Sequence, residues 1–490
     1  MTAATGAATG AGATGAGAAG EGAGGDGAGG DGAPPVRSVT AVVGLLVLFE
    51  LVSGFLQAGI APILPSIGDT FGVSDSAVAL VVSVQLLSAA VCAPAMGRLG
   101  DLYGHRRMLR IALACVAAGS VLCAVAPAFP VLLAGRLLQG PLVALMPLEI
   151  ALIRDRLPVG PARRAIARLV GALTLGGLLG GLGMGVAGKV FGDVRLALAV
   201  PAVLAVACVA VSMVAIPESV TRAAGRVDWP GVALLGLAVL GLLAGVSSAG
   251  DHGWGSGRVL VPALAGLALL AVWAFVELRT AEPLVDLRAM AGRHVAPFYF
   301  ASFAFGVIYF GGQSPNATFF ATDRDEAGYG FGLSSLSIAL AMLPAMAASI
   351  AGSACTARIA GKVGYRGALI GSFLLVGTGF VAFAAAHGAL WQVVAELTLM
   401  GLGMGTALGA MPTVIAEASN PSRTGVATAV YNNVKTVGGA VAGGLFGTLL
   451  AAPAGHDDPS EGGYVAVWLI GAAFALLAAL LAVAARRREG

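Results

Sequence analysis

The sequence predicts an all-α membrane protein of about fourteen transmembrane helices, arranged as two six-helix bundles with an inserted helix pair. Three observations predict this architecture: the composition, the length of the apolar segments and the placement of the positive charges. Hydrophobic residues make up 58% of the 490 residues and charged residues only 11%, with a mean hydropathy of +0.90. Soluble domains carry roughly a quarter charged residues, so this chain must be solvated largely by lipid.

Apolar segments of about twenty residues follow one another from Val39 onward, each long enough to cross about 30 Å of hydrocarbon. Short polar loops separate them. The expected spans are residues 39–66, 76–97, 108–127, 130–153, 166–188, 196–216, 230–248, 259–278, 295–321, 333–355, 367–386, 389–415, 425–451 and 464–485.

Basic residues test the span count independently, because they collect on the cytoplasmic side of a membrane protein. Most of the 28 basic residues fall in alternate connections. We therefore expect a multi-pass protein of the plasma (inner) membrane with both chain ends in the cytoplasm. Arg98, Arg106, Arg107 and Arg110 follow the second span, and Arg154, Arg156, Arg163, Arg164 and Arg168 follow the fourth, whereas the opposite side holds Lys189, Arg195, Arg258 and Arg324.

The N-terminal tail, residues 1–37, consists mainly of alanine, glycine and threonine. It lacks large apolar side chains to pack, so we expect it to be disordered. It also lacks a basic start followed by an apolar core, so it does not resemble a secretory signal. The five cysteines fall in or beside apolar stretches and show no disulfide or metal-ligand spacing, so neither metal nor cofactor is expected.

A short internal repeat divides the chain into two halves. Residues 97–109 align with residues 357–369 without gaps, matching Arg98 with Arg358 and Gly104 with Gly364. Duplicated halves with a binding site between them are typical of secondary transporters. The expected organisation is tail 1–37, N-terminal bundle 38–217, inserted helix pair 218–293, C-terminal bundle 294–486 and cytoplasmic tail 487–490.

Three motifs carry a family resemblance. Residues 97–107 (GRLGDLYGHRR) resemble the signature loop of the major facilitator superfamily. Residues 133–140 (LAGRLLQG) resemble its fourth-helix motif, and residues 431–439 (YNNVKTVGG) are similar to the penultimate helix of the fourteen-span drug:proton antiporters. Two features depart from the antiporter pattern: Leu182 stands where a proline is usual, and the first-helix aspartate ahead of Leu64 and Pro65 is absent.

The resemblance implies a secondary active transporter that exports small amphipathic or hydrophobic molecules against a proton gradient. Uptake or uniport of a natural metabolite is the alternative that the two departures favour. A non-transporting receptor or scaffold is a third reading, and an enzyme is not expected because no loop is long enough to hold a domain. The expected partners are the lipid bilayer, a small-molecule substrate and protons, with no nucleic acid, and the protein is expected to be monomeric.

The signature loop has a physical rationale as a gate. Glycines such as Gly97 and Gly104 allow a tight turn between helices. Asp101 could bind the N-terminal end of the thirteenth span, near residues 422–425, where helix N–H groups attract a carboxylate. Arg106 and Arg107 could add charge pairs. The other interpretation of this loop is a solvated basic turn.

Glu50 and Arg136 lie inside expected spans, where ionisable groups are costly and usually functional. Counting 1.5 Å per residue from the ends of their spans places them at similar depths. We therefore expect them to face each other or a shared water, with protonation of Glu50 linked to substrate binding. A purely structural pair that never releases a proton is the alternative.

Several further side chains are weaker candidates. Gln57 shares a helix face with Glu50 and could bind substrate, while Glu396 and Lys435 could line the substrate pathway. Glu149, close to Arg154 and Asp155, is expected in an interfacial charge network. Gly177, Gly181 and Gly185 are expected to allow close helix packing.

Overall fold

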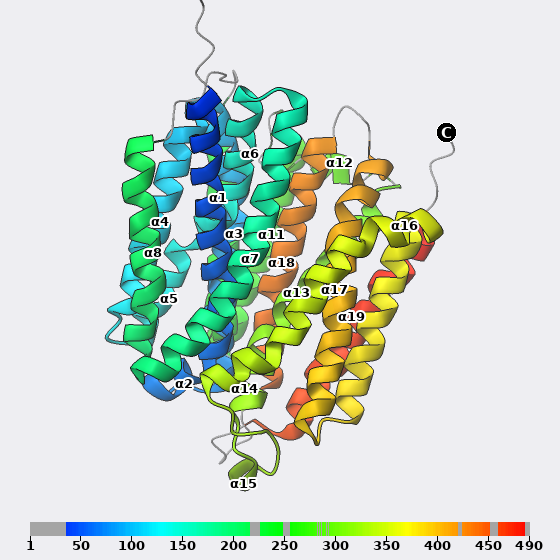
Figure 1. Ribbon diagram of the computed structural model, residues 1–490. Helices are drawn as coiled ribbons and strands as arrows, with labels where there is room; N and C mark the ends of the chain where they lie inside the picture. The colour runs from blue at the N-terminus through cyan, green and yellow to red at the C-terminus, as the bar shows by residue number, and fades with distance from the viewer. Residues whose placement is uncertain are drawn as a thin grey trace, which may run out of the picture.

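The computed structural model describes residues 36–215, 226–247, 255–419 except 282, 284, 286, 291 and 293, then 424–450 and 459–485. Within these ranges the chain forms helices connected by short turns (Figure 1). The expected tails lie outside the described residues, apart from the start of the first helix. Helices suit a lipid environment because each one satisfies its own backbone hydrogen bonds.

The N-terminal half contains six membrane-crossing segments. The first and fourth are each interrupted by a short 3-10 turn (η), of which Pro62 and Pro141 are the second residues. The helices are α1 (Val36–Gly59), η1 (Ala61–Ile63), α2 (Leu64–Phe71), α3 (Asp75–Tyr103), α4 (His105–Ala124), α5 (Phe129–Leu138), η2 (Gly140–Ala144), α6 (Leu145–Arg156), α7 (Val159–Phe191) and α8 (Val194–Ala215).

The C-terminal half repeats this pattern. Its first crossing is divided at Gly312, and its second and third are joined into one 51-residue helix that breaks at Gly364. The helices are α13 (Ala296–Gly311), α14 (Gln313–Ala321), α15 (Arg324–Ala327), α16 (Ser335–Ala385), α17 (Leu390–Ala418), α18 (Thr424–Leu449) and α19 (Glu461–Ala484).

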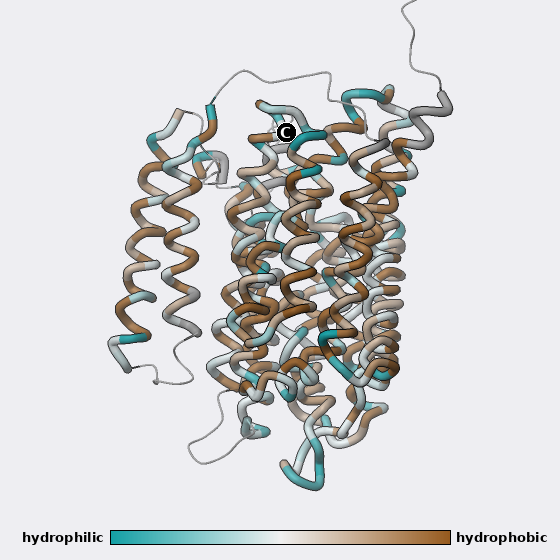
Figure 2. Tube along the Cα trace, turned by 90° about the vertical axis from the view of Figure 1, so that its left-hand side faces the viewer, coloured by the Kyte–Doolittle hydropathy of each residue, from teal (hydrophilic) through white to brown (hydrophobic). Residues whose placement is uncertain are grey.

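Between the halves, α9 (Trp229–Ser247) and α11 (Gly257–Arg279) pack against each other, followed by the short α12 (Leu287–Met290). This pair stands at one side of the bundle (Figure 2), where α9 contacts α3 of one half and α18 of the other. The outward face of α11 is apolar, as a lipid-facing surface requires. Its exposed large hydrophobic side chains are Leu260, Val261, Leu264, Leu267, Val272, Phe275 and Leu278.

By length and composition, ten helices of the described residues could cross a membrane, one of them the divided helix α16. The fold class predicted from the sequence is confirmed, while the count of fourteen remains a prediction. We call the end where α1 begins and α19 ends the proximal end, and the end that holds α2, α14 and α15 the distal end (Figure 1).

The internal repeat is visible in the backbone. Gly104, between α3 and α4, and Gly364, inside α16, have φ angles of 102° and 76°, a region that favours glycine. Each half also uses an arginine after this break to bind the end of its sixth crossing. Arg110 donates to the carbonyl of Ser212 in α8 at 2.8 Å, and Arg366 donates to that of Ala482 in α19 at 2.7 Å.

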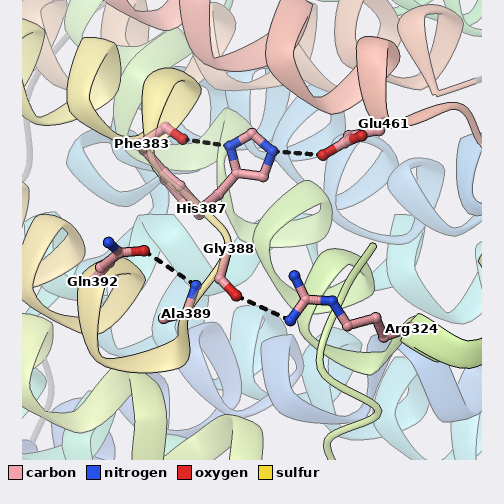
Figure 3. Close-up of polar contacts among 7 residues, drawn as sticks. All are labelled: Arg324, Phe383, His387, Gly388, Ala389, Gln392 and Glu461. Atoms are coloured by element: carbon pink, nitrogen blue, oxygen red, sulfur yellow. Dashed lines mark hydrogen bonds and ion pairs between the residues drawn. The ribbon is translucent and has the colours of Figure 1, made fainter. Parts of the chain in front are cut away.

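At the distal end, polar contacts fasten the connection between α16 and α17 (Figure 3). His387 lies between the carbonyl of Phe383, at 3.0 Å, and the carboxylate of Glu461, at 2.8 Å. Arg324 donates to the carbonyl of Gly388 at 3.0 Å. These bonds hold the start of α19 against the neighbouring turn.

Candidate functional site

Arg136 is the centre of a buried polar cluster in the N-terminal half. The side chain is 3% exposed, and its guanidinium donates to the carbonyl of Val81 at 2.8 Å, to Gln139 Oε1 at 2.5 Å and to Gln85 Oε1. Gln139 in turn donates to Ser120 Oγ at 2.9 Å. A buried charge is tolerated only with such partners, so this cluster ties α3, α4 and α5 together.

A small pocket opens beside this cluster. Apart from Arg136, its walls are almost entirely apolar, and the guanidinium itself is already bonded to three acceptors. Its lining residues are Phe55, Leu56, Gly59, Ile60, Cys123, Leu132, Arg136, Met184, Leu198 and Pro201.

Glu50 lies elsewhere, against Glu149 of α6. Both side chains are fully buried, and the two carboxyl groups are electrostatic neighbours. None of their four oxygens accepts a hydrogen bond from a donor in the described part of the chain. The structure therefore contains a pair of buried acids without a neutralising base.

Two predicted placements are corrected by this geometry. The predicted contact between Glu50 and Arg136 is wrong, because the first crossing continues through η1 and α2 to Phe71. Arg136 instead shares its pocket with Leu56 and Ile60, which lie roughly 9–15 Å further along the helix than Glu50.

The predicted placement of Glu149 in an interfacial charge network is also wrong. Glu149 is enclosed in the core against Glu50, whereas Arg154 is exposed and Asp155 half-buried at the proximal end of α6. The sequence placed Glu149 by its distance from Arg154 along the helix, which does not reveal the side of the helix that a neighbour covers.

The signature loop forms a turn within its own half. Asp101 pairs with His105 Nε2 at 3.1 Å, and a Cβ on Gly100 would come within 2.6 Å of Leu148. Arg106 is half-buried and Arg107 exposed. No side chain of the described residues lies within 4 Å of the Cβ position of Gly97. The expected partner of Asp101, residues 422–425, falls where the structure describes no side chains.

Gln57 and Glu396 do not meet the Arg136 cluster. Gln57 Nε2 donates to Ser53 Oγ at 3.0 Å within α1. Glu396 lies near the distal start of α17, under the electrostatic influence of His387. The structure therefore does not gather the predicted pathway residues into one site.

Lys435 of α18 lies among aromatic rings of the C-terminal half. Its Nζ is 5.3 Å from the ring centre of Tyr431 and 6.0 Å from that of Phe310, distances at which a cation is attracted by an aromatic face. The hydroxyl of Tyr431 is buried without a hydrogen-bond partner in the described residues. This arrangement places the Lys435 ammonium beside two aromatic rings, one of which carries a buried hydroxyl.

The glycines of α7 form two faces. A Cβ on Gly176 or Gly180 would come within 1.9 Å of the Leu51 carbonyl or 2.3 Å of the Phe55 carbonyl in α1. A Cβ on Gly185 would lie 2.5 Å from Ala339 of α16, in the other half. The remaining predicted packing glycines lie at ordinary contact distances, with the nearest atom 3.6 Å from the Cβ position of Gly177 and 3.5 Å from that of Gly181.

The two halves meet toward the distal end. Tyr464 of α19 donates to Asp75 Oδ2 of α3 at 2.7 Å, and Ser66 Oγ lies 3.1 Å from Ser335 Oγ. A Cβ on Gly443 of α18 would overlap Ser83 of α3 at 1.4 Å. Sequence reasoning missed these residues, because Asp75 and Tyr464 stand at span ends, where polar side chains are unremarkable.

Most of the chain matches one protein family. The model of the Major Facilitator Superfamily matches residues 46–443. The chain belongs to the Major Facilitator Superfamily. Membership places it among membrane transporters, in agreement with the family predicted from the signature loop.

Curated relatives within the superfamily carry export and resistance names. The chain is 28% identical over 448 residues to a probable actinorhodin transporter of Streptomyces coelicolor, covering 87% of this chain and 76% of that one. It is 27% identical over 461 residues to the methylenomycin A resistance protein of Bacillus subtilis, covering 90% and 92%. It is 27% identical over 415 residues to the tetracenomycin C resistance and export protein of Streptomyces glaucescens, covering 81% and 73%.

Solved structures share the fold at low sequence identity. A crystal structure of the peptide transporter POT in complex with sulfate has a TM-score of 0.68 and 16% identity, covering 91% of this chain and 96% of that one. A crystal structure of the nucleoside transporter NupG has a TM-score of 0.65 and 14% identity, covering 93% and 100%. These similarities show the fold alone.

Proposed function

We propose that this protein is a secondary transporter that exports small amphipathic or hydrophobic organic molecules from the cell in exchange for protons. The observation that carries the proposal is the closed distal contact between the halves, centred on Asp75 and Tyr464. Alternating access requires such a contact to form in one state and break in the other. The named export and resistance relatives supply the direction and the class of substrate.

The proposed orientation rests on the positive charges, which are concentrated in the loops at the proximal end. With the proximal end in the cytoplasm, both chain ends face inward, and the closed distal contact seals the outer side. This state would receive substrate from the cytoplasm or the inner leaflet. The proposed energy source is the proton gradient, with no bound cofactor.

Lys435 and its aromatic neighbours are the proposed contact for an acidic or phenolic group on the substrate. The ammonium would pair with the acidic oxygen, while the rings of Tyr431 and Phe310 would pack against an aromatic substrate. A substrate that carries both an acidic oxygen and an aromatic ring would bind through the ammonium and the rings together.

The test is transport in proteoliposomes that contain the purified full chain, with an imposed pH gradient and a panel of hydrophobic dyes and antibiotics. We expect at least one compound to move against its gradient only while the pH gradient is maintained, and a protonophore to stop this movement. Liposomes without protein are the control. Movement that ignores the pH gradient, or that proceeds only down the substrate gradient, would contradict proton-coupled export and favour uniport of a metabolite.

A further inference from the structure

His387, at the distal end, has a hydrogen-bond acceptor at each of its two ring nitrogens (Figure 3). Nδ1 lies 3.0 Å from the carbonyl oxygen of Phe383, and Nε2 lies 2.8 Å from the carboxylate of Glu461. A carbonyl oxygen and a carboxylate can only accept, whereas a neutral imidazole has one N–H to donate. Both contacts are hydrogen bonds only when both nitrogens carry a proton, so this geometry fits the charged imidazolium.

Glu461 is placed where an ionised carboxylate is favoured. It is the first residue of α19, and the N-terminus of a helix attracts negative charge. The side chain of Glu461 is 54% exposed and that of His387 is 15% exposed. The pair is therefore open to the solution on the distal side, from which the imidazole can take up a proton.

The charges around the ring also favour the imidazolium. Besides Glu461, Glu396 of α17 is an electrostatic neighbour of His387. The basic side chain that contacts this turn, Arg324 of α15, is directed at the carbonyl of Gly388. Among the described residues, the ring thus has acids of both α17 and α19 as neighbours.

Aromatic rings fix the imidazole and connect it to the contact between the halves. The ring centre of His387 lies 5.1 Å from that of Trp468 and 5.8 Å from that of Phe319. Tyr464 packs against the same two rings, with centres 6.2 Å and 5.3 Å apart, and it follows Glu461 on α19 by about one turn. The hydroxyl of Tyr464 in turn closes the distal contact between the halves. The proton on His387 therefore helps to position the residue that closes this end.

Loss of this proton would weaken the attachment of α19. One ring N–H bond breaks, its electron pair stays on the nitrogen and the proton passes to water. Either Phe383 or Glu461 then faces a ring nitrogen without a hydrogen between them, so the start of α19 is held less firmly. Because the closed arrangement binds this additional proton, a rise in pH favours distal opening.

We propose that His387 and Glu461 form a pH-sensitive switch, in which a proton from the outer solution stabilises the closed contact between the two halves. The assignment to the outer solution rests on the proposed orientation. The proton is regulatory and is bound in addition to those that the proposed transport carries. Histidine changes its charge between about pH 5 and pH 8. An acidic exterior would therefore keep the distal side closed and slow the cycle when the inward driving force on protons is largest.

The first test measures distal opening of the purified full chain as a function of pH. Spin labels at the exposed distal residues Thr70 and Asp325 report the separation of the halves by pulsed electron resonance. From about pH 5 to about pH 8, the ratio of open to closed molecules should rise about tenfold, the effect of losing one charge-assisted hydrogen bond. Glu461→Gln should abolish this dependence, because an amide can donate to the unprotonated Nε2 and accept from the protonated one.

The matched control is His294→Gln, which removes a histidine at the proximal end, before α13, and should respond to pH like the wild type. A wild-type distance distribution that does not change with pH would overturn the switch. So would a Glu461→Gln variant that keeps the full pH dependence.

The second test observes the ring protons by nuclear magnetic resonance of the chain with isotope-labelled histidine, where the signals of His387 are those missing from His387→Gln. At about pH 5 both ring N–H groups should be visible, because hydrogen bonding slows their exchange with water. At about pH 8 one of them should be lost. Glu461→Ala should remove the Nε2–H signal even in acid, since that nitrogen then faces water. An Nε2–H signal that is missing from the wild type in acid, or that Glu461→Ala leaves unchanged, would contradict the doubly protonated ring.

Both tests use the protein in detergent without a gradient, so their outcome does not depend on transport. A distal contact that responds to pH, in a protein without pH-driven transport, would support the switch while the proposed function fails. Transport driven by a pH gradient, together with a distal separation that ignores pH, would overturn the switch and leave the proposed function intact.

Discussion

The hydroxyl of Tyr464 donates to the carboxylate of Asp75 at 2.7 Å and so joins the two halves at their distal end. The tyrosine is fully buried. Its oxygen also lies 2.9 Å from Thr318 Oγ1, and its ring packs edge-on against Phe319 with centres 5.3 Å apart. The C-terminal half therefore presents the hydroxyl in a fixed position, and the bond can exist only while the distal end is closed.

Tyr464→Phe should shift the protein toward distal opening. A hydrogen bond to a charged group contributes about 1.5–3 kcal/mol, so the ratio of open to closed molecules should rise by about tenfold or more. Spin labels at the exposed distal residues Thr70 and Asp325 would report the separation of the halves by pulsed electron resonance. Thr318→Val is the control, since it keeps the bond to Asp75. A distance distribution identical to that of the wild type would show that the bond does not hold the closed state.

Arg136→Lys should destabilise the N-terminal half although it keeps the charge. A lysine ammonium on an unbranched stem cannot reproduce the planar contacts to Val81, Gln85 and Gln139, and each lost bond costs about 1.5–3 kcal/mol. Thermal unfolding in detergent should therefore begin at a clearly lower temperature. Arg164→Lys, at an exposed position on α7, should unfold like the wild type. Equal unfolding temperatures for both variants would contradict the structural role of Arg136.

Gly176→Ala should impair folding, because its Cβ would lie 1.9 Å from the carbonyl oxygen of Leu51. Backbone cannot move aside as a flexible side chain can, and overpacking of this kind costs about 1–3 kcal/mol or more. Gly171→Ala, on the same helix with open space at its Cβ position, is the matched control. The yield of monodisperse protein in size-exclusion chromatography should fall for Gly176→Ala alone. Equal yields would mean that α1 and α7 pack less closely than described.

Gly104→Ala and Gly364→Ala should each lower stability by about 1–3 kcal/mol, because both positions have φ angles that other residues adopt only under strain. The two substitutions should lower the free energy of unfolding by similar amounts, because they change equivalent positions of the two repeats. Gly97→Ala and Gly361→Ala, which meet no described atom within 4 Å, should be nearly neutral in chemical unfolding. A loss confined to one half would contradict the equivalence of the two breaks.

The sequence was sufficient for the fold because the features that determine it are periodic and local. Apolar length marks the crossings, and the repeated loop marks the duplication, which the φ angles of Gly104 and Gly364 reflect. Most boundaries agreed within a few residues, and the larger shifts lie at the end of α3, the start of α7 and the break at Gly364. The exception that mattered was the first crossing, which extends to Phe71 and so changes the depth of Glu50.

The site was harder to predict because its partners come from different helices. Counting residues gives depth along one helix but not rotation about its axis. Glu50 and Arg136 seemed matched in depth, yet the ionisable neighbour of Glu50 is Glu149. Gln85 carries no motif signal at all and binds Arg136 from α3. Pairing of this kind depends on how helices are turned toward each other, which one sequence does not display.

The two glycine faces of α7 imply different fates for the same kind of substitution. The face at Gly176 and Gly180 touches α1 of its own half, so it stays in place throughout a transport cycle. The face at Gly185 touches α16 of the opposite half, so it must separate and rejoin at every turnover. A methyl group on the first face should impair folding of the N-terminal half. A methyl group on the second face should instead change the equilibrium between the inward-open and outward-open conformations of the folded protein.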